Sequence, residues 1–181
     1  MNENLRSRAK RPVAVQLRPV EPGDEPVLVR IYAGSRAEEL TLAPWGERGK
    51  RAFVEMQLAA QTQHYRAHYP AAQHQIICAD GEPIGRLYLD KRPSEVRILD
   101  IAVLPENRNA GIGTLVVTNI LEEAGSARLP VTVYVETYNS AMRFFENLGF
   151  QKTTQDELKV LMRWDPENQE QVVQRVTGPN G

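Results

Sequence analysis

The hydrophobic and polar positions of the first 70 residues predict one strand and two helices. Residues 13–20 have the character of a strand, and the Glu-Pro-Gly-Asp sequence at residues 21–24 predicts a turn that ends in a helix N-cap. Apolar residues then fall on one helical face up to Gly34. A long amphipathic run predicts a second helix over residues 47–69, which Pro70 ends.

The next segment of the chain has the shorter apolar runs of strands. Residues 75–79 and 83–90 flank Asp80 and Gly81, a dipeptide that favours a hairpin turn. A third strand is expected over residues 95–104, after a turn that contains proline.

The remaining regular segments alternate between helix and strand. They comprise predicted helices over residues 110–124 and 139–148 and predicted strands over residues 131–136, 150–154 and 158–164. Gly149 follows the second helix, where a left-handed glycine commonly ends a helix. The order of elements predicts a mixed α/β or α+β sheet domain, and it leaves the topology open.

Length and composition agree with a single domain. The chain has 181 residues, of which 41% are hydrophobic and 25% are charged, as in ordinary globular proteins. We expect a folded domain over residues 13–164, a flexible basic arm over residues 1–12 and a flexible polar tail over residues 165–181.

Charge and cysteine content exclude several classes of function. The 22 basic and 23 acidic residues give a net charge of -1, which offers no electrostatic reason to expect nucleic acid as a partner. Cys78 is the only cysteine, and the three histidines lack the context of a zinc site, so neither a disulfide nor a metal is expected. The sequence has no apolar span of roughly 20 residues and no signal-peptide pattern. It therefore predicts a cytoplasmic protein without a membrane partner.

The stretch from residue 99 to residue 115 carries the most specific chemistry. A strand breaks at Pro105, and Gly111 and Gly113 then precede a helix. Glycines at a helix start let backbone N–H groups approach a ligand closely, and these groups suit an anion such as pyrophosphate. Helix capping and close packing of a helix on a sheet also produce such glycine pairs, so the residues alone leave both interpretations open.

Spacing argues against two other glycine-rich nucleotide sites. A P-loop needs lysine and then serine or threonine after its second glycine, whereas Thr114 and Leu115 follow Gly113. A dinucleotide fingerprint needs three glycines in the pattern G-x-G-x-x-G, and only G-x-G is present.

Two motifs resemble those of the GNAT superfamily of N-acetyltransferases. The first resembles the R/Q-x-x-G-x-G/A signature of acetyl-CoA binding, and its fixed positions are Val103, Pro105, Arg108, Gly111 and Gly113. The second, over residues 139–150, resembles the pattern N-x-A-x-x-x-Y-x-x-x-G-F and lies about 30 residues further on. The resemblance covers roughly residues 13–164.

The resemblance implies a fold and a cofactor site. It implies one GNAT-like domain with a mostly antiparallel sheet of about six to seven strands, flanked by about four helices. The strand at residues 131–136 is expected to splay from that at residues 99–104 and to open a slot for acetyl-CoA as co-substrate. The backbone of Ile101, Ala102 and Val103 would pair with the pantetheine arm. The other implied cofactor-binding residues hold the pyrophosphate or the CoA arm: Arg108, Asn109, Ala110, Gly111, Ile112, Gly113, Thr114, Asn139 and Phe145.

The family's usual reaction is direct attack of a neutral amine on the thioester in a complex that holds both substrates. The resemblance thus implies an N-acetyltransferase whose acceptor is an amine of a small molecule, a protein or a peptide. An alkyl ammonium with a pKa of about 10 must first lose a proton. Asp100, in the strand beside the thioester, is the predicted base, and Glu95 and Glu136 are further candidates. A backbone N–H near Val103 is expected to polarise the acetyl carbonyl.

The chain departs from the family at the position of the general acid. Phe145 stands where many members have a tyrosine that protonates the leaving thiolate, and a phenylalanine has no proton to give. Tyr138 is the predicted substitute, and Tyr134 is a second candidate.

This departure and the lack of an obvious base keep a second hypothesis open, a non-catalytic module that binds acetyl-CoA or CoA. A third hypothesis is a nucleotide- or phosphate-binding domain without acyl chemistry. The resemblance also makes a homodimer an expectation. The acceptor, the length of the acyl group and the oligomeric state stay undetermined by the sequence.

Overall fold

The computed structural model describes residues 13–137, 139 and 141–168. The arm predicted over residues 1–12 and most of the tail predicted over residues 165–181 lie outside these residues. The regular elements are α1 (Glu25–Ser35), α2 (Ala37–Leu42), α3 (Glu47–His68), α4 (Ile112–Ser126), α5 (Ala141–Asn147), β1 (Val15–Pro19), β2 (Gln73–Ala79), β3 (Glu82–Lys91), β4 (Val96–Val103), β5 (Val131–Glu136), β6 (Gln151–Gln155) and β7 (Lys159–Trp164).

The strands form one seven-stranded sheet in the order β1-β2-β3-β4-β5-β7-β6. Neighbouring strands run antiparallel except for β4 and β5, which are parallel and are connected through α4. This arrangement confirms the mixed α/β class and the mostly antiparallel sheet.

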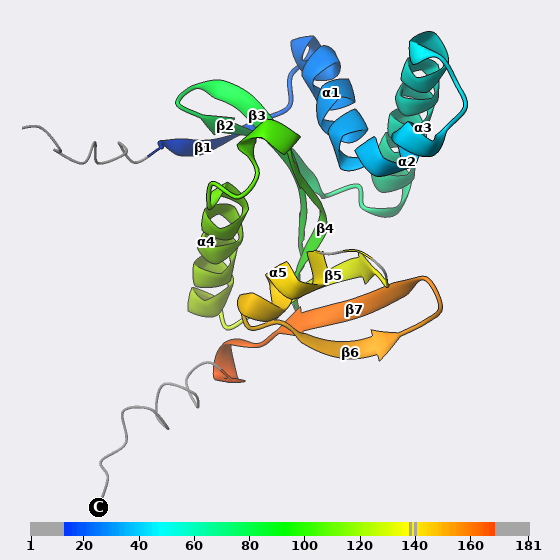
Figure 1. Ribbon diagram of the computed structural model, residues 1–181. Coiled ribbons are helices and arrows are strands. Elements are labelled where there is room, and N and C mark those ends of the chain that lie inside the picture. The colour runs from blue at the N-terminus through cyan, green and yellow to red at the C-terminus, as the bar shows by residue number, and fades with distance from the viewer. Residues whose placement is uncertain (1–12, 138, 140, 169–181) are drawn as a thin grey trace, which may run out of the picture.

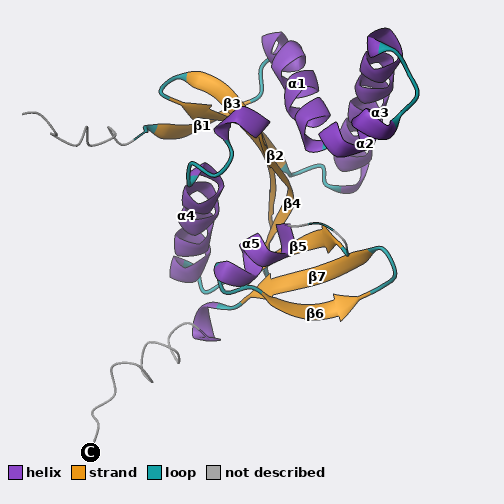
Figure 2. Cartoon of the chain, in the orientation of Figure 1, coloured by secondary structure: helices purple, strands orange, loops and turns teal. Residues whose placement is uncertain are grey.

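Helices cover the two faces of the sheet, and a core lies under each layer (Figure 1). The main core joins α4 and α5 to β3, β4, β5 and β7, and it includes Val117, Phe145 and Met162. A second core joins α1 and α3 to β2 through residues such as Tyr32, Leu58 and Ile76. Figure 2 shows α4 on one side of the sheet and α1 to α3 on the other.

Most predicted elements are present, with bounds shifted by one or two residues. Helix α4 begins at Ile112 rather than at residue 110, because Gly111 has a φ of 78° and acts as the N-cap. Helix α2 was not predicted. Its six residues are too few to show the apolar stripe from which a helix is recognised, although Leu40 packs against the second core.

Candidate functional site

A β-bulge divides β4 into two halves with opposite alternation. Val96 and Ile98 belong to the main core, and after the bulge Ile101 and Val103 pack against the same core. A strand with a period of two cannot place both pairs on one face unless one residue is inserted. The inserted residue is Leu99, since Tyr88 pairs with Asp100 and the adjacent Leu89 pairs with Ile98.

Pairing between β4 and β5 stops at this bulge. The two strands share only three residue pairs, and the last of them joins Ile98 to Val133. Beyond it, residues 99–103 and 134–136 diverge, as Figure 1 shows where β5 turns away from β4. We call this divergence the splay. It agrees with the divergence that the sequence motifs implied.

The second half of β4 directs part of its backbone toward the splay. The N–H of Leu104 donates to the carbonyl oxygen of Ile84 at 2.8 Å, so Leu104 faces β3. Backbone groups of successive residues point to opposite sides of a strand, so Ala102 also faces β3, while Ile101 and Val103 face the splay. In agreement, a Cβ added to Gly85 of β3 would lie 2.6 Å from the Ala102 carbonyl oxygen.

The start of α4 presents backbone N–H groups next to the end of β4. The first intrahelical bond runs from Leu115 N–H to the Gly111 carbonyl oxygen at 2.9 Å, which leaves the N–H groups of residues 112–114 without helical acceptors. Asn109 and Gly111 both have positive φ, 59° and 78°. A Cβ added to Gly111 would meet no atom within 4 Å. This open, amide-rich turn suits an anion.

Arg108 connects this turn to α1. Its guanidinium donates to the carbonyl oxygens of Val103 at 3.1 Å and Gly34 at 2.9 Å. Gly34 also packs against Pro105, whose Cδ would lie 2.7 Å from an added Cβ. Arg108 thus holds α1 against the turn, and its predicted contact with pyrophosphate stays a prediction.

Asp100 lies on the face of β4 that α1 and α3 cover. Its Oδ2 is 2.8 Å from Nε of Arg86, a residue of β3 whose side chain is 1% exposed. Burial raises the pKa of Asp100, and the positive charges of Arg86 and Arg36 oppose this rise. The role of Asp100 as the base stays a prediction.

Tyr65 of α3 forms a hydrogen bond with the inserted residue of the bulge. Its hydroxyl donates to the Leu99 carbonyl oxygen at 3.0 Å, and its ring packs edge-on against Tyr88. Burial and the nearby Asp100 carboxylate raise the pKa of Tyr65, so the hydroxyl stays protonated and remains a donor. No local sequence pattern indicates this contact, because it joins residues 34 positions apart.

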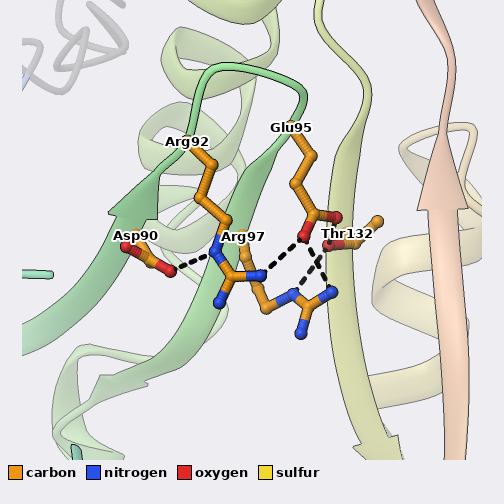
Figure 3. Close-up of polar contacts among 5 residues, drawn as sticks. All are labelled: Asp90, Arg92, Glu95, Arg97 and Thr132. Atoms are coloured by element: carbon orange, nitrogen blue, oxygen red, sulfur yellow. Dashed lines mark hydrogen bonds and ion pairs between the residues drawn. The ribbon is translucent and has the colours of Figure 1, made fainter. Parts of the chain in front are cut away.

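A polar network fixes β4 to β5 just before the splay (Figure 3). Glu95 accepts hydrogen bonds from Arg97 at 2.8 Å and from the Thr132 hydroxyl at 2.9 Å. Arg92 bridges Glu95 at 3.2 Å and the buried Asp90 at 2.6 Å. Glu95 is therefore held as a structural acceptor, which disfavours it as the base.

Glu136, a candidate base, and Tyr134, a candidate general acid, both lie on β5. Oε1 of Glu136 lies 3.6 Å from Nη2 of Arg36, and the two side chains form an ion pair. This ion pair links the α1–α2 connection to β5 across the splay. Tyr134, the first residue beyond the last β4–β5 pair, is 49% exposed, and the Arg97 guanidinium carbon lies 5.6 Å from its ring centroid.

The second motif lies at α5. Oδ1 of Asn139 accepts a hydrogen bond from the Ala141 N–H at 2.9 Å. The side-chain NH2 group of Asn139 is then left to donate to other partners. Phe145 is 3% exposed and packs between Phe144 and Phe150, so its ring is part of the main core. The cofactor contacts predicted for both residues stay predictions. Tyr138 lies outside the described residues.

An open cleft of about 720 Å³ lies between α1, α2 and α3, and none of its lining residues comes from β4, β5 or α4. It is therefore separate from the splay.

In the described part of the chain, no three side chains of the metal-binding types gather into a site. Every helix there is too short or too polar to cross a bilayer.

Comparison with known proteins agrees with this geometry. The model of the Acetyltransferase (GNAT) family matches residues 36–150. The match spans more than half of the chain, and the protein therefore belongs to the GNAT acetyltransferase family. No curated protein sequence matches it significantly.

Solved structures with the same fold include several acetyltransferases. PaiA N-acetyltransferase from Thermoplasma acidophilum, in complex with coenzyme A, has a TM-score of 0.64 and 16% identity over 84% of this chain and 99% of that chain. Ard1 from Thermoplasma volcanium has a TM-score of 0.58 and 21% identity over 84% and 98%. The ribosomal-protein-S18-alanine N-acetyltransferase from Escherichia coli has a TM-score of 0.58 and 16% identity over 84% and 94%. At these identities the likeness shows the fold alone.

Proposed function

We propose that the protein is an N-acetyltransferase that moves the acetyl group of acetyl-CoA to a primary amine of a small molecule, a protein or a peptide. The observation that carries the proposal is the alignment of two features. The backbone of Ile101 and Val103 faces the splay, and the free N–H groups of α4 lie just beyond the end of the same strand. One extended ligand with a peptide-like arm and a pyrophosphate would satisfy both.

The residues present fit acetyl-CoA. The pantetheine arm has amides that a strand edge can pair with, and Ile101 and Val103 supply that edge. Amides of residues 109–114 would hold the pyrophosphate, with Gly111 leaving room for its close approach. When bound, acetyl-CoA supplies an activated acyl group as its thioester.

The chemical steps then fall to three groups of the chain. Asp100 would take the proton of the acceptor ammonium, directly or through a water. A backbone N–H of Ile101 or Val103 would stabilise the developing oxyanion. Tyr138 would return a proton to the thiolate, since Phe145 has none to give. Cys78 is a free, buried thiol, which fits the reducing cytoplasm where we place the reaction. Assembly as a homodimer is part of the same proposal.

Titration calorimetry with acetyl-CoA tests the cofactor site. The informative pair of variants is Gly111→Glu and Gly81→Glu. Both glycines have positive φ, 78° and 88°, and neither has an atom within 4 Å of an added Cβ, so the backbone strain is matched. Gly81 lies in the β2–β3 turn, away from the splay.

We expect wild type and Gly81→Glu to bind acetyl-CoA with micromolar affinity and Gly111→Glu to lose at least tenfold of it. A folded wild type without affinity for acetyl-CoA refutes the proposal. Thiol release in the presence of an amine panel then separates the enzyme from the non-catalytic binding module. The panel would contain spermidine, free lysine and a peptide with a free N-terminus.

A further inference from the structure

The side chain of Arg86 is an ion buried beside the proposed site. It lies on β3, is 1% exposed, and is among the largest fully buried side chains of the described residues. Removal of an ion from water costs several kcal/mol, and an apolar residue of similar volume is often as stable in such a place. Stability alone therefore gives no reason for arginine here.

Three elements hold the guanidinium of Arg86. Asp100 of β4 lies 2.8 Å from Nε, and Gln61 of α3 accepts a hydrogen bond from Nη2 at 2.8 Å. The ring of Tyr32 of α1 lies 5.1 Å from the guanidinium carbon. The group is therefore fixed from β4, α3 and α1 at once, which gives it one orientation.

The two carboxylate oxygens of Asp100 differ in their exposure to solvent. Oδ2 is enclosed beside Arg86, whereas the side chain as a whole keeps 22% of its surface exposed. An incoming group can therefore meet this carboxylate only through Oδ1. Nε of Arg86 and Oδ2 lie close without the alignment of a hydrogen bond, so the attraction between them is mainly ionic.

The charges around Asp100 come from each element packed against it. Arg86 faces it from β3, and Arg36 acts on it from the α1–α2 connection while pairing with Glu136 of β5. Tyr65 of α3 faces it as a neutral phenol, as does its cross-strand neighbour Tyr88. Arg86 is the nearest of these charges and is fully desolvated, so its attraction is screened least.

We propose that Arg86 is a positioning residue that holds the Asp100 carboxylate with Oδ1 directed to the acceptor. This inference rests on the proposed function. In the step it supports, an N–H bond of the ammonium breaks and the proton passes to Oδ1. The freed nitrogen lone pair forms the C–N bond as the C–S bond breaks. The nitrogen then releases a second proton, which balances the proton that the proposed general acid gives to the leaving thiolate.

Two variants of Arg86 test the role, with Arg18→Met as the control. Arg18 of β1 also pairs with a buried aspartate, Asp24, at 2.7 Å, and it makes no contact with Asp100 among the described residues. We expect Arg86→Met to move the acidic limb of kcat/KM for the amine upward by at least one pH unit. We also expect kcat to fall at least tenfold, while the Kd for acetyl-CoA changes less than twofold. Arg86→Lys should recover part of both effects.

A readout without turnover keeps the inference separate from the proposed function. The ¹³C carboxyl signal of Asp100, assigned with Asp100→Asn, reports its titration in the free protein. We expect its midpoint to rise by at least one pH unit in Arg86→Met and by a smaller amount in Gln61→Leu, which removes one anchor and leaves the arginine. Gln61→Leu serves if Arg86→Met does not fold.

An unchanged carboxyl titration overturns the positioning role, even in a protein that turns over. An unchanged acidic limb with an altered carboxyl titration also overturns it, because Asp100 would then not be the base. Absence of acetyl-CoA binding in wild type refutes the proposed function instead.

Discussion

Removal of the Tyr65 hydroxyl would test how α3 shapes the splay. Tyr65→Phe keeps the ring and its packing against Tyr88 but deletes the 3.0 Å hydrogen bond to the Leu99 carbonyl oxygen. That carbonyl belongs to the inserted residue of the bulge, so β3 does not pair with it. The bulge would lose the partner that holds it in place.

The expected magnitude follows from leaving a partly buried acceptor unsatisfied. Such a loss costs about 1 to 2 kcal/mol of the free energy of unfolding. For a domain of this size it lowers Tm by about 2 to 8 °C. Since the bulge determines that Ile101 and Val103 face the splay, we also expect the Kd for acetyl-CoA to rise about three- to tenfold.

Calorimetric unfolding and acetyl-CoA titration measure the two effects. Tyr69→Phe is the matched control, because Tyr69 lies one helical turn further along and its hydroxyl makes no hydrogen bond to a described residue. If Tyr65→Phe changes Tm and Kd no more than Tyr69→Phe does, the bulge does not depend on α3 and the reasoning fails.

Three further predictions concern the stability of the fold. Gly85→Ala places a Cβ 2.6 Å from a carbonyl oxygen of β4 and should cost about 1 to 3 kcal/mol in urea unfolding, whereas Gly23→Ala, with nothing within 4 Å, should cost less than half as much. Burial lowers the pKa of His74 to about 4. As the pH falls below 6.5, His74 therefore binds a proton in the unfolded chain but stays neutral in the folded protein. The free energy of unfolding should fall by about 2 kcal/mol from pH 6.5 to pH 4, after allowance for solvent screening, and His74→Phe should flatten this part of the profile. Hydrogen bonds from Arg18 lower the pKa of Asp24 to about 2. Asp24→Asn should therefore cost about 1 kcal/mol above pH 4, and thermal unfolding should show this cost vanish toward pH 2.

Much of the cofactor side of the site could be predicted from the sequence. The glycines near residue 111, the strand before them and the helix after them are local features, and each is encoded by neighbouring residues. The structure agrees at Gly111, whose positive φ requires a residue without Cβ strain, and at Gly149, with a φ of 88°. The family match confirmed the resemblance that the two motifs indicated, and the contacts of the glycine turn with a cofactor stay a prediction.

The side of the sheet that α1 to α3 cover was predicted less well. Helix α2 was missed because six residues are too few to show a helical apolar stripe. The place of Glu95 in the polar network between β4 and β5 was not predicted from the sequence either. Arg86 looks like one more charged residue in a strand, since nothing in its sequence neighbours indicates a buried ion. Its partners Asp100, Gln61 and Tyr32 come from three different elements.

The sequence by itself determined the elements, the mixed class of the domain and the glycine turn, because periodicity, turn residues and caps act over a few neighbouring residues. Only the tertiary structure decided where β4 leaves β5, which backbone groups face the splay and which charges surround Asp100. The bulge at Leu99 illustrates the reason. It depends on a register between strands and on a hydroxyl from α3, and such long-range contacts form only once the chain has packed.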